Sequence, residues 1–128
     1  MNRWQLLFLG LLLMAVIGVG GCFLFPNHPP VASFTVEYGT DETDPLVVVL
    51  DASGSTDPDG DEIVSYMWSF DDNVTILTPL DYRKTVTVPV LTVRYPVEGT
   101  FYLTLAVVDS NGAMSDAVSA DMEVPAPE

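Results

Sequence analysis

Hydrophobic residues are distributed in two different ways along this chain. From Trp4 to Phe25 they form an almost unbroken run, interrupted only by Gln5 and glycines. From position 31 onward they occur in short β-branched and aromatic runs, which Gly, Pro, Asp and Asn separate. Such runs are typical of strands, and no helical periodicity of useful length accompanies them. We therefore expect an all-β domain behind an N-terminal hydrophobic segment.

The short runs predict about seven strands. In chain order they cover residues 31–38, 46–50, 63–70, an ambiguous piece at 74–82, two pieces within 83–95 around Pro89, then 101–109 and 113–124. Pro89 marks an edge or a bulge, because proline cannot donate to a sheet ladder. Short strands with turns at close spacing predict an immunoglobulin-like β-sandwich.

Two of these strands alternate clearly between apolar and polar positions, so each should turn one face to the core. The first face consists of Val64, Tyr66, Trp68 and Phe70, and the second of Phe101, Leu103, Leu105 and Val107. Trp68 is large enough to fill the centre of a sandwich, and we expect the second face to pack opposite it.

The N-terminal hydrophobic run has the order of a secretory signal: a positive start at Arg3, an apolar stretch and small residues at its end. Residues 19–22, Val-Gly-Gly-Cys, resemble the lipobox of bacterial lipoprotein signal peptides. The resemblance implies cleavage before Cys22 and a diacylglycerol on its sulfur. The alternative is an uncleaved anchor, since residues 4–25 are long enough to cross a bilayer. Both interpretations place the rest of the chain outside the cytoplasmic membrane.

These features predict four segments. A lipoprotein signal peptide covers residues 1–21, and the lipidated Cys with a Pro-rich tether covers 22–30. The β-sandwich covers residues 31–124, and a short tail covers 125–128. The prolines of the tether make it stiff and extended rather than helical.

Composition narrows the classes of partner. Lys and Arg number 4 against 18 Asp and Glu, so the formal net charge is -14. Nucleic acid is excluded as a partner, because binding to phosphates needs clustered Lys and Arg. The single Cys excludes an internal disulfide and a multi-Cys zinc site, and the single His excludes a two-His metal motif.

Several blocks of the chain, in the correct order, resemble the PKD (polycystic kidney disease-type) domain family. They are an opening at 29–32, a loop at 50–61, the strand at 63–70, a late strand at 99–105 and its turn at 107–112. The resemblance covers about residues 29–124. It implies an immunoglobulin-like sandwich that binds proteins or polysaccharides, or that spaces other parts of a protein.

One group of acidic residues could bind a metal ion. Asp57, Asp59 and Asp61 alternate within a loop, and carboxylates at such spacing suit Ca²⁺. The resemblance to PKD domains implies a cation site near this loop, at Asp59 and Asp61, with Asp109 and Asn27 as further ligands. Asp57 is the weaker candidate, because Asp before Pro also forms turns. The alternative is an exposed acidic turn whose side chains bond their own backbone, and both interpretations stay open.

No catalytic constellation is evident, so we expect a non-enzymatic protein. The favoured interpretation is a membrane-anchored extracytoplasmic lipoprotein whose domain binds another protein, as an accessory subunit of an envelope or surface complex. The alternative is a module that binds carbohydrate or cell wall, which would need several exposed aromatic rings on one face. Its candidates are Tyr38, Tyr82, Tyr95 and Tyr102. Alternation places Tyr102 on the outer face of its strand.

Overall fold

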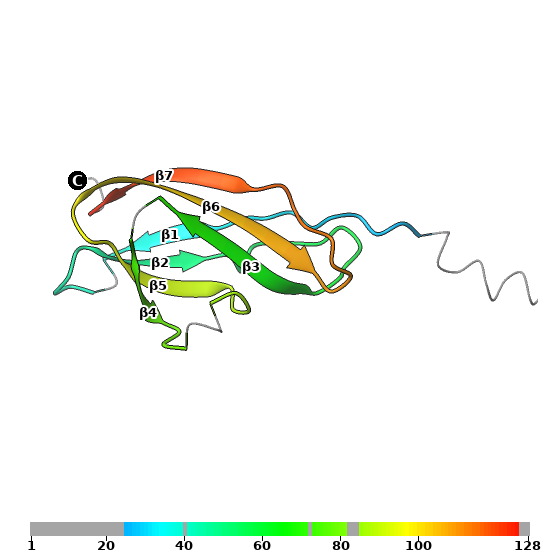
Figure 1. The fold of residues 1–128 in the computed structure, drawn as a ribbon, viewed down its shortest axis with the longest axis horizontal. Helices are drawn as coiled ribbons and strands as arrows, with labels where there is room; N and C mark the ends of the chain where they lie inside the picture. Colours follow the sequence, from blue (N-terminus) through cyan, green and yellow to red (C-terminus); the bar gives the residue numbers. More distant parts are fainter. Residues whose placement is uncertain (1–24, 40, 72, 82–84, 126–128) are drawn as a thin grey trace, which may run out of the picture.

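The computed structural model describes residues 25–39, 41–71, 73–81 and 85–125. These residues form seven strands (Figure 1): β1 (Thr35–Tyr38), β2 (Val47–Asp51), β3 (Ile63–Phe70), β4 (Thr75–Thr78), β5 (Val90–Arg94), β6 (Gly99–Asp109) and β7 (Val118–Val124). The predicted signal peptide and Cys22 lie outside the described residues, as does most of the predicted tail. The described part contains no helix that is long and apolar enough to span a membrane.

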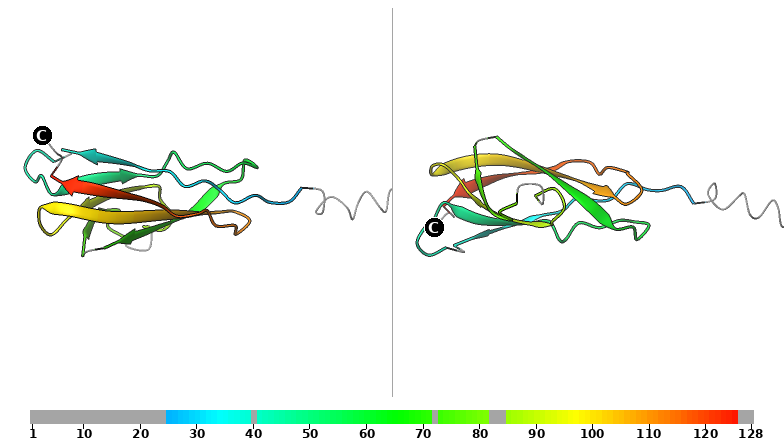
Figure 2. Two further views of the ribbon diagram at one scale, coloured as in Figure 1. Left: turned by 90° about the horizontal axis from the view of Figure 1, so that it is seen from above. Right: turned by 60° about the horizontal axis from the view of Figure 1, so that its bottom comes forward.

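The strands form two antiparallel sheets that pack face to face. One sheet has the order β1-β2-β5-β4, and the other has the order β3-β6-β7. Figure 2 shows the two layers from above and obliquely. The prediction of an all-β, immunoglobulin-like sandwich is therefore confirmed. β6 and its neighbours β3 and β7 make the most extensive pairings in the domain.

Three predicted runs are shorter in the structure than in the sequence analysis. Before β1, the first run forms an isolated bridge between Val31 and Thr56. Before β7, the last run forms another between Met114 and Val108. Of the two pieces predicted around Pro89, the second is the strand β5. In the described part of the first piece, residues 85–87 form a turn, and the carbonyl of Val86 accepts a hydrogen bond from the N–H of Tyr66 in β3.

The core lies between the sheets and is built from alternate residues of the longest strands. As predicted, the inner face of β6 is buried at Phe101, Leu103, Leu105 and Val107. Leu50 of β2 and Val93 of β5 meet this face from the other sheet within one cluster. Full burial of each such aliphatic side chain contributes about 1.5–3 kcal/mol.

The structure corrects two details of the predicted inner faces. A register shift between Ile63 and Ser65 turns Val64 outward, where 42 % of it is exposed, and Ile63 packs on the core in its place. Trp68 does not face β6 across the core, because β3 and β6 are neighbours in one sheet and Trp68 pairs with Leu105. Its partner across the core is Phe34, whose ring lies edge-on at 5.3 Å.

Candidate functional site

Three segments that are far apart in sequence meet at the end of the sandwich where the tether leaves it (Figure 1). The β2–β3 connection supplies the loop of residues 57–61, the turn after β6 supplies Asp109 and Asn111, and the tether supplies Asn27 and His28. We call the hydrogen-bonded groups of these segments the tether-end network.

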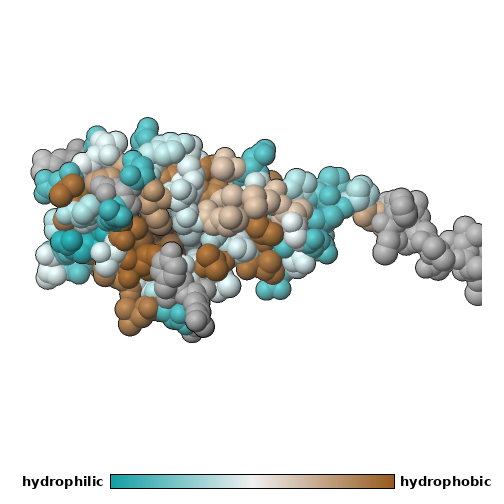
Figure 3. All heavy atoms as spheres, viewed as in Figure 1, coloured by the Kyte–Doolittle hydropathy of each residue, from teal (hydrophilic) through white to brown (hydrophobic). Residues whose placement is uncertain are grey.

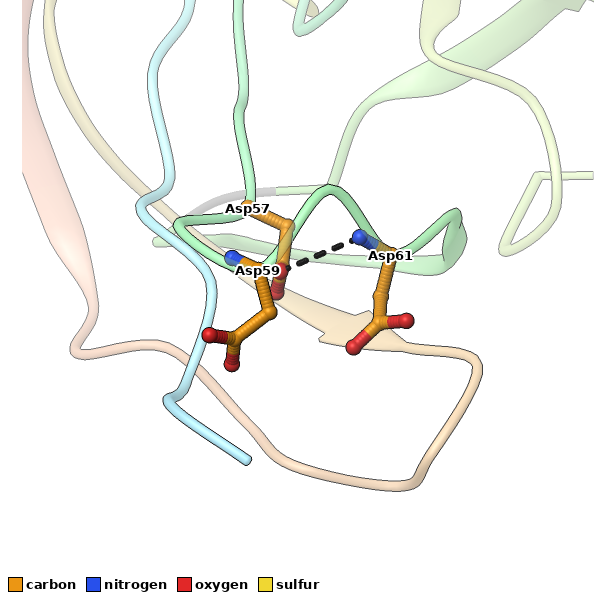
Figure 4. Close-up of side chains that lie close together, drawn as sticks. All are labelled: Asp57, Asp59 and Asp61. Carbon is orange, nitrogen blue, oxygen red and sulfur yellow. Dashed lines mark hydrogen bonds between the residues drawn. The ribbon is translucent and has the colours of Figure 1, made fainter. Parts of the chain in front are cut away.

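Asp57 organises the loop from within. Its Oδ1 accepts hydrogen bonds from the backbone N–H of Asp59 at 2.8 Å and of Asp61 at 3.2 Å. Gly60, with φ of +80°, supplies the left-handed backbone that this turn needs. Figure 4 shows the resulting group, in which one ligand oxygen from each of the three aspartates lies within 4.8 Å of the others. The second oxygen of Asp57, Oδ2, is buried without a hydrogen-bond partner.

Asp59 binds the tether through His28. Its Oδ2 accepts the backbone N–H of His28 at 2.6 Å, and its Oδ1 lies 3.0 Å from the ring Nδ1 of the same residue. These bonds favour the ionised carboxylate, so they hold the pKa of Asp59 below its usual value. The tether is therefore fastened to the sandwich at a point that the sequence analysis did not identify.

Asp109 is the buried member of the network, with 1 % of its surface exposed. Its Oδ2 accepts a hydrogen bond from the side-chain amide of Asn27 at 2.8 Å, and its Oδ1 accepts the backbone N–H groups of Asn111 and Ala113. The hydrogen bond from Asn27 lowers the pKa of this carboxyl group most, because it favours the ionised form, and the backbone hydrogen bonds add to the effect. Because a buried carboxylate needs such partners, Asp109 fixes both the tether and the turn.

Asn111 connects the acidic loop to the tether. Its side-chain amide donates to Asp61 Oδ2 at 2.7 Å and to Asn27 Oδ1 at 3.2 Å. All five residues that the sequence analysis named for the cation site thus come together at this end. His28 and Asn111 were missed, although the position of Asn111 two residues after a strand-ending Asp in an Asn-Gly turn was a usable signal.

The donor set suits a hard cation with oxygen ligands. Carboxylate oxygens from three aspartates converge, and the unpartnered Asp57 Oδ2 is the kind of buried acceptor that a cation would satisfy. Protein donors already engage Asp59 and Asp61, but an ionised carboxylate keeps further lone pairs that a cation could use. The residues therefore fit Ca²⁺.

The tyrosines do not form an aromatic platform in the part of the chain that the structure describes. Tyr102 lies on the outer face of β6, with 46 % of its surface exposed, as alternation predicted. Tyr95 is fully buried, its ring centroid 4.4 Å from that of Phe101, and burial raises its pKa to about 12. Tyr38 is half-buried and Tyr82 lies outside the described residues.

A cavity that the sequence analysis did not anticipate opens between the edge strands of the two sheets. Its volume is about 300 Å³. The walls come from β3, β4, β5 and their connections: Trp68, Phe70, Asn73, Val74, Ile76, Thr85, Val86 and Leu91. We call it the edge cavity. The indole N–H of Trp68 is buried without an acceptor, which costs about 1–3 kcal/mol.

Comparison with known proteins agrees with the fold. The family model described as PKD domain matches residues 27–124. No curated protein matches the chain. Among solved structures, the PKD1 domain of Vibrio anguillarum Epp is 26 % identical with a TM-score of 0.57, covering 80 % of this chain and 100 % of that one. The PKD1 domain of the Vibrio cholerae metalloprotease PrtV is 26 % identical with a TM-score of 0.54, covering 76 % and 98 %.

A third similar structure is described as explaining the promiscuous specificity of carbohydrate-binding modules from the β-sandwich superfamily. It is 30 % identical with a TM-score of 0.57, and the match covers 80 % of this chain. The match covers only 36 % of that chain, so the likeness concerns one part of a longer protein.

The lowered pKa of Asp109 predicts a pH-dependent contribution to stability. Its ionised form is stabilised in the folded state, so this contribution is complete well above the usual Asp pKa of 3.8 and is lost as pH falls through the folded value. We expect Asp109→Asn to lower the melting temperature by several degrees at pH 7 and by progressively less below pH ~4.

Asp121→Asn is the matched control, because Asp121 is exposed on β7. It should leave the melting temperature unchanged across the same pH range. A destabilisation by Asp109→Asn that stays constant from pH 7 to pH ~2 would contradict the assignment.

Proposed function

Because the chain belongs to the PKD-domain family, we propose that it is a non-enzymatic binding module and that its ligand is another protein. One observation carries this choice. Six of the eight described residues that line the edge cavity are aliphatic or aromatic, and one of them, Val86, is 48 % exposed. Figure 3 shows hydrophobic patches on the surface of this face of the domain. Exposed apolar surface beside a concave site is typical of protein contacts. The partner we propose is a component of an envelope or surface complex, to which this chain is an accessory subunit.

Carbohydrate is the second candidate ligand, since the third similar structure is described by its carbohydrate-binding modules. Sugar rings bind to modules of this kind by stacking on exposed aromatic faces. Tyr102 offers one such ring, and in the described residues its neighbours on the outer face of β6 are Thr104 and Ala106. The indole of Trp68 contacts Phe34 instead. This arrangement favours protein over polysaccharide.

The absence of an enzymatic role is supported by where the titratable groups lie. Among the described residues that line the edge cavity, none is Asp, Glu, His, Cys, Lys or Tyr. The carboxylates of the tether-end network are engaged in holding loops and tether. General acid–base or nucleophilic catalysis needs such groups facing a bound substrate, and the described walls of the edge cavity offer none.

We further propose that the protein is a lipoprotein, anchored outside the cytoplasmic membrane by lipid on Cys22. The sequence before the sandwich supports this, and the tether emerges from one end of the domain, as an anchored module requires. The mass of the mature protein from its native cells should correspond to residues 22–128 with an added diacylglycerol. An intact Met1 would instead indicate the uncleaved anchor.

Ca²⁺ is proposed as a ligand of the tether-end network, through Asp57, Asp59 and Asp61, with Asp109 and Asn27 nearby. Binding to the folded state alone raises stability by mass action, so millimolar Ca²⁺ should raise the melting temperature of the full chain by a few degrees over a chelator. Asp57→Asn should reduce this rise, whereas Asp121→Asn should not. Equal melting temperatures with Ca²⁺ and chelator would contradict calcium binding.

The proposed function is tested by cross-linking tagged full-length protein in its native cells, followed by purification and mass spectrometry. We expect one dominant protein partner in nearly equal amount. Retention of cell-wall glycan without a stoichiometric protein would support the carbohydrate alternative. Tyr102→Ala would then be the variant to measure, because it removes the exposed ring without touching the core.

A further inference from the structure

The outer edge of β7 presents backbone groups of three consecutive alternate residues. β7 is the end strand of its sheet and pairs with β6 alone. In β6, the carbonyl of Tyr102 accepts a hydrogen bond from the N–H of Asp71, so the backbone of Tyr102 faces β3. Opposite residues of an antiparallel pair face either toward or away from each other, so Asp121, the partner of Tyr102, faces away from β6. By alternation, Ser119 and Glu123 face the same outer edge.

The chain beside this edge is described without a gap, from residue 25 to 39 and from residue 85 to 125. Among the described residues, none forms a hydrogen bond with the N–H or C=O of Ser119, Asp121 or Glu123 at the outer edge. β1, which lies on the same side of the sandwich as β7 (Figure 2), pairs with β2 instead. A strand edge with unpaired N–H and C=O groups is a template for another strand.

An apolar groove lies between the start of β7 and the segment that leads into β1. Its volume is about 240 Å³, and its walls are Pro29, Pro30, Val31, Ala32, Asp116 and Val118. Val118 belongs to the inner face of β7, because it pairs with the buried Leu105 of β6. A strand added to β7 would turn every second side chain toward this inner face. The side chain that lies beside Val118 would therefore enter the groove.

The charges on this side of the sandwich favour a basic occupant. Glu37, Asp116, Asp121 and Glu123 are exposed, and residues 25–39 and 113–125 contain no Lys or Arg. Because Asp121 and Glu123 are two positions apart, they share one face of the sheet as well as its outer edge. Lys or Arg at alternate positions of an added strand would lie directly opposite them, as oppositely charged cross-strand pairs do.

The basic residues of the chain are few, and those that the structure describes do not neutralise this side. They are Arg3, Arg83, Lys84 and Arg94. Arg94 lies on β5 and bonds to Asp44. Arg83 and Lys84 belong to the connection between β4 and β5, and β4 is at the opposite end of its sheet from β1.

A second copy of the chain is a poor occupant of the β7 edge. If two β7 strands paired about a twofold axis at Asp121, the two Asp121 carboxylates would face each other, and like charges directly opposite destabilise a sheet. The net charge of -14 on each copy adds to this repulsion.

We propose that the outer edge of β7 binds an extended basic segment of a partner protein by β-strand addition. The segment pairs with the backbone of Ser119, Asp121 and Glu123, places Lys or Arg opposite the two acids, and inserts an apolar side chain into the groove beside Val118. Main-chain hydrogen bonds supply affinity in this mode of recognition, and the side chains supply specificity. The inference rests on the proposed protein-binding function and adds a surface distinct from the edge cavity.

The test selects binders from a displayed library of random twelve-residue peptides against the full-length chain in detergent micelles. We expect enriched peptides with Lys or Arg at alternate positions and an apolar residue nearby, and affinities that fall as salt is added. Glu123→Lys should weaken their binding at least tenfold, because it places a positive charge opposite the basic residues. Glu123 is exposed, so the fold tolerates the change.

Glu62→Lys is the matched control, with the same change of charge at an exposed residue next to β3, the strand at the other edge of this sheet. It should leave peptide affinity within twofold of the original. Enriched peptides that bind the Glu123→Lys and Glu62→Lys variants equally well would overturn the inference, and so would a selection that enriches no basic peptide.

Amide hydrogen exchange, measured by NMR, tests the backbone pairing itself. The N–H groups of Ser119 and Asp121 face outward, so their exchange should slow at least tenfold when a selected peptide is bound. The N–H of Met122 faces β6 and should be protected in the free chain already, which makes it the internal reference. Unchanged exchange at Ser119 and Asp121 under saturating peptide would refute strand addition.

The two proposals fail in distinguishable ways. A protein partner that is recovered from cells equally well by the Glu123→Lys and Glu62→Lys variants would refute the β7 edge as its site, while the protein-binding function would stand. Recovery of glycan without a protein partner would refute the protein-binding function itself.

Discussion

A carboxylate can be buried only where donors replace the water that it loses, and the tether end of this domain is arranged around that requirement. Asp109 is inaccessible to solvent, so its two oxygens need the turn that follows β6 and the amide of Asn27. The side-chain oxygen of Asn27 accepts a hydrogen bond from the amide of Asn111, and the same amide also donates to Asp61. The loop, the turn and the tether are therefore held as a unit by the partners that one buried charge demands.

Alternation of side chains was sufficient to predict the strands, because each long strand buries one face in a two-layer sandwich. It identified the inner face of β6 and the exposure of Tyr102. It could not place Val64, because a bulge at the start of β3 shifts the alternation by one residue without any mark in the sequence. Nor could it show that Trp68 lies beside β6 rather than across from it, since strand order is a property of the whole fold.

Only part of the candidate site could be predicted, because a sequence shows groups of neighbouring residues but not contacts between distant ones. The acidic loop is visible in the sequence because its residues are contiguous. The roles of His28 and Asn111 depend on contacts across 31 and 50 positions, which only the folded chain brings together. The edge cavity has no sequence signature, because its lining residues come from strands and connections that only the folded chain brings together. The sequence therefore predicted the residues of the acidic loop, whereas the edge cavity depends on the topology of the strands.

The fastening of Asn27 and His28 to the domain limits how far the domain can stand from a membrane. With Cys22 lipidated as proposed, four residues lie between Cys22 and Asn27, the first fastened residue. The five Cα–Cα steps between them span at most about 18 Å when fully extended. The acidic loop would then face the lipid headgroups at a distance not far above the Debye length of ~8 Å. Repulsion from anionic headgroups would then act on this end of the sandwich and oppose a closer approach of the domain to the bilayer.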